Sequence, residues 1–411
     1  MHLYDIPLCF ALAGLALYTV LGGADFGAGI WQLSAGADEA GERIRQHTHD
    51  AMAPVWEANH VWLVFVLTVV WTAYPTAFGS IASTLSIPLF IAGIGIVFRG
   101  AAYALRAGSP SRRELRMIDT LFALSSVLTP FALGAVVGGI ASLRVPLGNA
   151  AGHLFSSWLN PTGILIGVIA VVNSAYLAAV YLSADAVRAG DEYLERQFRL
   201  RALGAGVLAG IVAIGGIAVL HSDAHRLYHG LVEGDGLPAL IVSILAGIAT
   251  LALVWRRRYE PARYTAALAV AAIIAGWALA QEPLLLRDLT IAQAAAPHDT
   301  LVLVIVAVLA GGAILFPSLA LLFRLVLGGR LEHGEGVAGA EMPQVAGGRD
   351  LLAASATGLA ARCAGAGMLV GIGLLTIADA GWAHAIGIVG LFCFVAFGFL
   401  AVAPARLAGQ A

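Results

Sequence analysis

A carboxylate, an amide and an imidazole lie close together in the segment 56–62, which reads WEANHVW. A long apolar run, 63–70, follows directly. If that run crosses a membrane, Glu57 and His60 lie at its mouth, where an ionisable side chain is costly and is expected to have a function. A carboxylate there could take up and release protons, and an imidazole could bind a haem iron.

Two further polar features fall inside apolar runs. Asp25 lies in the stretch 22–29, whose glycines would let a neighbouring helix approach the backbone closely. Arg99 lies near the end of another apolar run. Charged side chains at such depths are expected to face other helices rather than lipid.

Membrane-spanning helices must position these residues. Hydrophobic residues make up 60% of the 411-residue chain, charged residues only 12%, and the mean hydropathy is +0.87. Soluble domains carry roughly 25% charged residues. The apolar runs show no period of two, so we expect an all-α fold, a polytopic transmembrane helical bundle.

A span needs about 20 mostly apolar residues, and the runs predict about eleven spans. The first run is long and has no basic residues before it, so it is predicted as a span rather than a cleavable signal. The polar, Gly-rich linker 328–351 predicts a nine-helix domain over 1–327 and an extra two-helix segment over 352–411. The predicted spans are 5–33, 54–74, 77–105, 115–142, 160–184, 202–220, 237–255, 263–281, 299–326, 352–377 and 381–403.

The arginines predict the orientation. All 23 basic residues are arginine. With the N-terminus outside, the outer loops hold only Arg144, Arg226 and Arg287, Arg99 lies within a span, and the rest fall on the cytoplasmic side. An odd number of spans then places the C-terminus inside. The segment 38–50 is amphipathic and is predicted to lie at the interface as a short helix.

On this topology Asp25, Glu57 and Arg99 share the cytoplasmic third of the bilayer, within roughly 10 Å of one another in depth. A proton path from the cytoplasm would need such groups at such a depth. Alternatively, Arg99 could neutralise a carboxylate and hold three helices together. Asn59 is expected to be a hydrogen-bonding strut, and His60 could bridge helices instead of binding haem.

Other classes of function are less well supported. A secondary transporter could use the Asp/Glu/Arg set as an ion site, but transporters place broken helices in both halves, and this set is confined to the first three spans. A purely structural membrane subunit is a further alternative. The net charge of -2 gives no nucleic-acid footprint. The isolated cysteines argue against zinc or iron–sulfur sites, whereas His221-x-Asp223-x-His225 could bind a metal or be a solvated loop.

Four motifs resemble, in order and spacing, subunit II of the bacterial cytochrome bd-type quinol oxidases. They are GADFGxG over 23–29, APVWExNxVWL over 53–63, YP at 74–75 and FR at 98–99. The segment 277–291, with WALAQEPLLL and DLTI, also resembles the cyanide-insensitive branch of that family. The likeness covers about 5–327.

The resemblance implies a haem-free subunit of a quinol:oxygen oxidoreductase in the bacterial cytoplasmic (inner) membrane. Its partner, subunit I, would hold haem b with or without haem d, oxidise quinol and reduce dioxygen to water. This chain would then contain no catalytic, haem-binding or metal-binding residue. It would stabilise the complex and contribute a proton path; a structural quinone or lipid could also bind. The path residues would be Glu57, Asp25, Arg99, Asn59 and His60, with Trp62 beside an oxygen route.

Glu57 stands where other members commonly have Asp, which is a mild change because either carboxylate can relay protons. The chain departs from the family pattern more clearly in two ways. His60 stands where other members often have Gln or Glu. The family typically ends near the position of Leu327, so the last two spans are extra. They could be a lipid-facing addition, a fused small accessory subunit or a binding surface for another protein.

Overall fold

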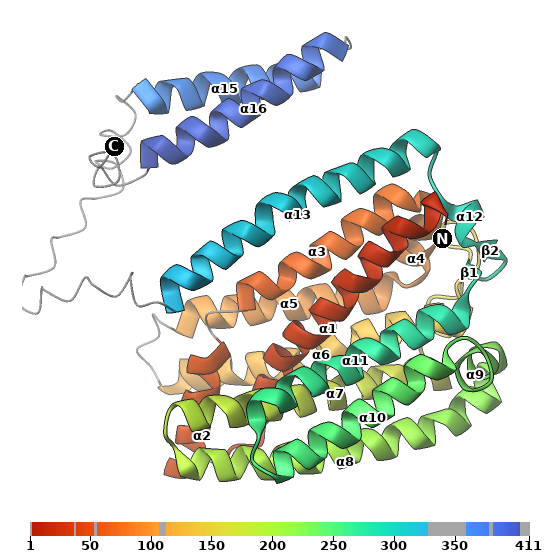
Figure 1. Ribbon diagram of the computed structural model, residues 1–411, viewed down its shortest axis with the longest axis vertical. Helices are drawn as coiled ribbons and strands as arrows, with labels where there is room; N and C mark the ends of the chain where they lie inside the picture. Colours follow the sequence, from red (N-terminus) through yellow and green to blue (C-terminus); the bar gives the residue numbers. More distant parts are fainter. Residues whose placement is uncertain are drawn as a thin grey trace, which may run out of the picture. The chain divides into compact units, whose positions relative to one another are not determined.

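The computed structural model describes residues 2–36, 38–52, 56–106, 112–327, 359–377 and 381–402. Nearly all of them are helical, which confirms the predicted all-α bundle (Figure 1). Contacts divide the chain into two compact units, Met1–Leu315 and Phe316–Ala411. The long helices of the first unit are α1 (Ile6–Leu33), α3 (Trp56–Ala73), α5 (Ser86–Arg106), α6 (Arg112–Ala141), α7 (Pro161–Arg188), α8 (Glu192–Asp223), α10 (Leu237–Trp255) and α11 (Tyr259–Gln281).

Short elements connect the long helices of this unit. They are η1 (Leu3–Asp5), α2 (Glu39–Met52), α4 (Pro75–Thr84), α9 (His225–Val232), β1 (Leu284–Leu286), β2 (Leu289–Thr290) and α12 (Ile291–Ala294). Helix α13 (His298–Leu327) starts in the first unit and ends in the second, which also contains α15 (Leu359–Ile377) and α16 (Gly381–Val402). Helices α15 and α16 pack closely, because Gly367 and Gly390 let their backbones approach.

Helix α1 packs against α3, α6 and α7, which lie beside it in Figure 1. Its glycines permit this, as predicted. A Cβ added to Gly27 would overlap the carbonyl oxygen of Ser174 on α7, and one added to Gly29 would overlap the hydroxyl of Ser126 on α6. The apolar core next to this contact includes the fully buried Leu177 and Val180 of α7.

Seven helices in the described ranges are long and apolar enough to cross a membrane, or eight if the α4–α5 pair counts as one span. The predicted span 77–105 is in fact broken, because α4 and α5 are bent by 82° at Leu85. Pro88 accounts for the break, since it has no N–H to donate to the Thr84 carbonyl. The total of eleven spans and the orientation stay predictions.

Helix α2 covers the predicted amphipathic segment and docks onto the α7–α8 turn. Arg43 forms an ion pair with Asp191 at 2.6 Å, and Ile44 is buried on the inner face of α2. The Leu194 backbone amide, with help from Arg43, holds the pKa of the Asp191 carboxyl below its usual range. Asp191 is also the N-cap of α8.

A short β-hairpin follows α11, and the all-α prediction did not include it. Helix α11 ends at Gln281, and the Gln281 side-chain amide donates to the carbonyl of Leu285 at 2.9 Å. Strands β1 and β2 are antiparallel and bury Leu286 and Leu289 in a cluster with Tyr74 and Leu85. The hairpin therefore closes one end of the helix bundle with apolar side chains.

Candidate functional site

Asp25 of α1 and Arg99 of α5 form an ion pair in the interior of the first unit. The Arg99 Nη2 donates to Asp25 Oδ1 at 2.6 Å, and its Nε donates to Oδ2 at 3.0 Å. Both side chains are completely buried, at 0% exposure. Each carboxylate oxygen thus accepts one bond from the planar guanidinium, which is the strongest geometry for an arginine–carboxylate pair.

Arg99 also donates hydrogen bonds to two further acceptors. Its Nη2 donates to the backbone carbonyl of Asp25, and its Nη1 donates to the hydroxyl of Ser126 on α6, both at 2.5 Å. The ring centres of Phe122 and Phe26 lie 4.1 and 5.0 Å from the guanidinium carbon. Aromatic faces stabilise a desolvated guanidinium, so this site is built to hold a permanent positive charge.

Helix α3 contributes Asn59 and His60 to the same region. The Asn59 side-chain amide donates to the Leu21 carbonyl of α1 at 3.2 Å, so it is the interhelical strut that the sequence led us to expect. The His60 ring is half-buried, with its centre 6.1 Å from that of Tyr18 and 6.4 Å from that of Phe26. Both aromatic neighbours belong to α1, so His60 packs across the α1–α3 contact.

Two other predicted site residues also belong to α3. Glu57 is in its first turn, but its side chain lies outside the part of the chain that the structure describes. Trp62 is half-buried and meets Phe65 edge-on, with ring centres 6.3 Å apart. The structure therefore brings Asp25, Arg99, Asn59 and His60 together around α1, and places Glu57 less than one helical turn from Asn59 along the chain.

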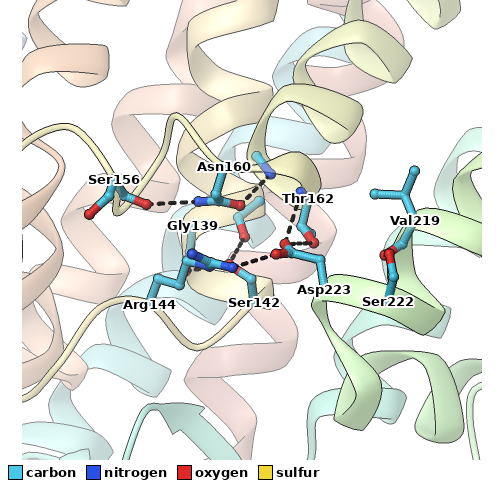
Figure 2. A network of polar contacts seen from close by, with 11 residues as sticks. Gly139, Ser142, Arg144, Ser156, Asn160, Thr162, Val219, Ser222 and Asp223 are labelled. Atoms are coloured by element: carbon cyan, nitrogen blue, oxygen red, sulfur yellow. Dashed lines mark hydrogen bonds and ion pairs between the residues drawn. The ribbon is translucent and has the colours of Figure 1, made fainter.

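A second, partly buried polar network joins the ends of α6, α7 and α8 (Figure 2). Arg144 forms an ion pair with Asp223 at 2.5 Å. The other carboxylate oxygen of Asp223 accepts from the hydroxyl of Thr162 at 2.6 Å and from its backbone amide at 3.1 Å. Asn160 caps α7 by accepting from the Gly163 amide. Asp223 therefore satisfies a free amide at the α7 N-terminus and neutralises Arg144.

This network argues against a metal site formed by His221, Asp223 and His225. The rings of His221 and His225 are 5.3 Å apart, but both oxygens of Asp223 already accept hydrogen bonds from other elements. Within the described ranges, no group of three His, Cys, Asp or Glu side chains could hold a metal ion. The segment is a helix-end clamp in this structure.

Replacing Asp223 by alanine is expected to destabilise the protein by about 1–3 kcal/mol, because charged hydrogen bonds to Arg144 and Thr162 are lost. The thermal midpoint of the purified complex measures this change. Asp235→Ala is the control, since Asp235 is exposed. Equal midpoints for the two variants would show that the clamp contributes nothing.

Comparisons with known sequences and structures identify the protein family to which this chain belongs. The family model for cytochrome bd terminal oxidase subunit II matches residues 3–326. The chain belongs to this family. The bd oxidase from Geobacillus thermodenitrificans has a similar solved structure, with a TM-score of 0.64 and 26% identity over 80% of this chain and 99% of that chain.

Curated subunit II relatives match over shorter stretches. Cytochrome bd ubiquinol oxidase subunit 2 of Bacillus subtilis (strain 168) is 26% identical over 134 residues, which is 33% of this chain and 39% of the relative. Cytochrome bd-I ubiquinol oxidase subunit 2 of Escherichia coli (strain K12) is 26% identical over 180 residues, 42% of this chain and 46% of the relative. The matched stretches span less than half the length of each relative.

Sequence reasoning about this subunit II missed the partners of Arg99 on α6. Ser126 donates to the Phe122 carbonyl one turn earlier while accepting from Arg99, and neither Ser126 nor Phe122 belongs to a motif. The only signal was the hydroxyl pair Ser125-Ser126 inside an apolar run. Serines in such runs commonly bond back to their own helix, so the sequence did not distinguish this pair from ordinary ones.

Proposed function

We propose that this chain is the haem-free subunit II of a terminal oxidase complex that oxidises quinol and reduces dioxygen to water. The partner would be a haem-bearing subunit I, holding haem b with or without haem d, in the bacterial cytoplasmic membrane. The family match over residues 3–326 carries this proposal. The first unit would stabilise the haem subunit as a rigid helical partner.

The proton path through this subunit begins at Glu57. A carboxylate at the start of α3 lies near an aqueous face on the predicted topology, so it can exchange protons with the cytoplasm. Asp25 and Arg99 serve the path as a fixed pair of charges, because a carboxylate with both oxygens bound by a guanidinium already has its partners. Asn59 holds α3 against α1, and this contact sets the position of Glu57.

His60 and Trp62 have supporting roles in this proposal. His60 packs between the rings of Tyr18 and Phe26, which supports an interhelical contact rather than haem ligation. Trp62 borders a route for oxygen toward the partner's haem. The additional helices α15 and α16 extend the subunit beyond the family match, and a fused accessory segment is one role for them.

Glu57→Gln tests the proton role. The amide is nearly isosteric but cannot carry a proton, so quinol-dependent oxygen uptake by the assembled complex is expected to fall about tenfold, which corresponds to about 1.4 kcal/mol in the barrier. Haem content is measured in parallel and should be unchanged. Glu57→Asp, the residue common in the family, should retain most of the activity. An unchanged rate in Glu57→Gln would refute the role.

The geometry of the Asp25–Arg99 pair makes a secondary transporter a weaker alternative. An ion site must release its ligand, whereas Asp25 and Arg99 bind each other through two charged hydrogen bonds in a fully buried site. Glu57→Gln also separates the alternatives that remain. A purely structural subunit would leave turnover unchanged once the complex has assembled.

A further inference from the structure

A groove on the first unit lies between α1, α7 and α8, and neither Asp25 nor Arg99 lines it. Its volume is about 660 Å³, which falls within the roughly 300–1,000 Å³ of typical small-molecule sites. Apolar side chains line most of it, among them Ile30, Val171, Val172 and Leu208. The polar side chains of the lining are Trp31, Ser34, Gln197 and Arg201. Such a division between apolar and polar walls suits an amphipathic ligand.

Arg201 is the charged group of this groove. Its guanidinium carbon lies 5.7 Å from the ring centre of Trp31 and 5.5 Å from that of Phe198, and its Nη1 donates to the side chain of Gln197 at 3.0 Å. No carboxylate of the described residues forms an ion pair with Arg201, and it is half-buried. Trp31 is fixed beneath it, since the indole N–H donates to the Ala175 carbonyl at 2.8 Å.

The position of Arg201 along α8 sets its depth. It is the last charged residue before the stretch 202–220, which contains no charged side chain and is long enough to cross the hydrocarbon core. The preceding turns of α8 carry Glu195, Arg196 and Arg199. On the predicted topology Arg201 therefore lies at the boundary between the lipid headgroups and the acyl chains, where tryptophan is enriched and arginine side chains extend toward the headgroups.

We propose that this groove binds an anionic phospholipid. The phosphate would be held by Arg201 and Gln197, and one acyl chain would lie along the apolar walls formed by α7 and α8. A phosphodiester neutralises the half-buried guanidinium and uses its remaining donors, while a free phosphate would leave the apolar walls unfilled. The bound lipid would fill the gap between α1 and α8 as part of the folded subunit.

The charge of the site is tested with the purified, delipidated oxidase complex that contains this chain. Native mass spectrometry follows its titration with phosphatidylglycerol, and Arg201→Gln is compared with Arg196→Gln. Both variants remove one positive charge from α8, but Arg196 is exposed and lies outside the groove lining. We expect the tightest lipid site to weaken about fivefold in Arg201→Gln only. Equal affinity in the two variants would overturn the proposal.

The acyl-chain part of the site is tested with two glycines of α8. A Cβ added to Gly204 or to Gly210 would meet nothing within 4 Å, but only Gly204 lines the groove. Gly204→Leu should therefore fill the groove and lower lipid occupancy several-fold, whereas Gly210→Leu should not. Equal occupancy in the two leucine variants would contradict the groove as the acyl-chain site.

Competition experiments distinguish the source of the anion. Inorganic phosphate and glycerophosphoglycerol, the headgroup without acyl chains, should not displace phosphatidylglycerol at millimolar concentration. Displacement by either would show a site for a free anion and would overturn the lipid assignment. The lipid assignment would also be overturned if the parent complex retained a quinone instead of a lipid and the Gly204→Leu variant lost that quinone. None of these outcomes depends on quinol oxidase activity, so they are separable from the proposed function.

Discussion

Replacing Arg99 by leucine is expected to abolish accumulation of the assembled complex. The change removes both charged bonds to Asp25 and leaves that carboxylate buried with 0% exposure. Removing one partner of a buried ion pair costs about 3–5 kcal/mol. That is a large part of the roughly 5–15 kcal/mol by which proteins are stable. The measurement is the amount of complex, and its haem, recovered per unit of membrane protein.

The double variant Asp25→Leu with Arg99→Leu is the matched control. It removes both charges, so no uncompensated carboxylate remains, and the loss of stability should be smaller than that of Arg99→Leu alone. Arg99→Lys keeps the charge but cannot form the two-pronged contact, so an intermediate yield is expected. Normal accumulation of Arg99→Leu would contradict the account of this pair.

Replacing Gly27 by alanine is expected to have the second largest effect. The new methyl group would overlap the carbonyl of Ser174 and lie 2.7 Å from the Cβ of Ala178, so α1 and α7 must move apart. Overpacking of a tight contact typically costs about 1–3 kcal/mol. Because the displaced α1 carries Asp25, the contact of Asp25 with Arg99 should weaken at the same time. The thermal midpoint and the yield of the complex measure the change.

Gly93→Ala provides the comparison for that experiment. Gly93 lies on α5, and a Cβ there would meet nothing within 4 Å. Alanine has the higher helix propensity by about 1 kcal/mol, so this variant should be as stable as the parent or slightly more so. If Gly27→Ala were as stable as Gly93→Ala, the close approach of α1 and α7 would be disproved.

The sequence predicted the helices and the close contact of α1 because both follow from local pattern. Charged residues in apolar runs need partners, so the sequence indicated that Arg99 could neutralise a carboxylate, but it left open whether that carboxylate was Asp25 or Glu57. The glycine stretch 22–29 indicated a close helix contact because only small residues allow one. It did not indicate which helices would be reached, since that depends on packing between distant parts of the chain.

The break at Leu85 separates α4 from α5 although the apolar run continues across it, and Pro88 was its signal in the sequence. Other features depend on tertiary contacts that no local pattern encodes. The Asp223 network links residues 61 and 79 positions apart, and in the sequence Asp223 looked like part of a solvated or metal-binding loop. Arg201 looked like one more cytoplasmic arginine until the structure placed it over Trp31.

The proposed function requires this chain to assemble with a haem-bearing quinol oxidase subunit. The decisive experiment is purification of the tagged chain from its native membrane, with a reduced-minus-oxidised spectrum and quinol-dependent oxygen uptake measured on the product. We expect a haem-containing partner to co-purify in equal amount and oxygen uptake to depend on quinol. A chain that is recovered folded but alone, without haem and without oxygen uptake, would contradict the account.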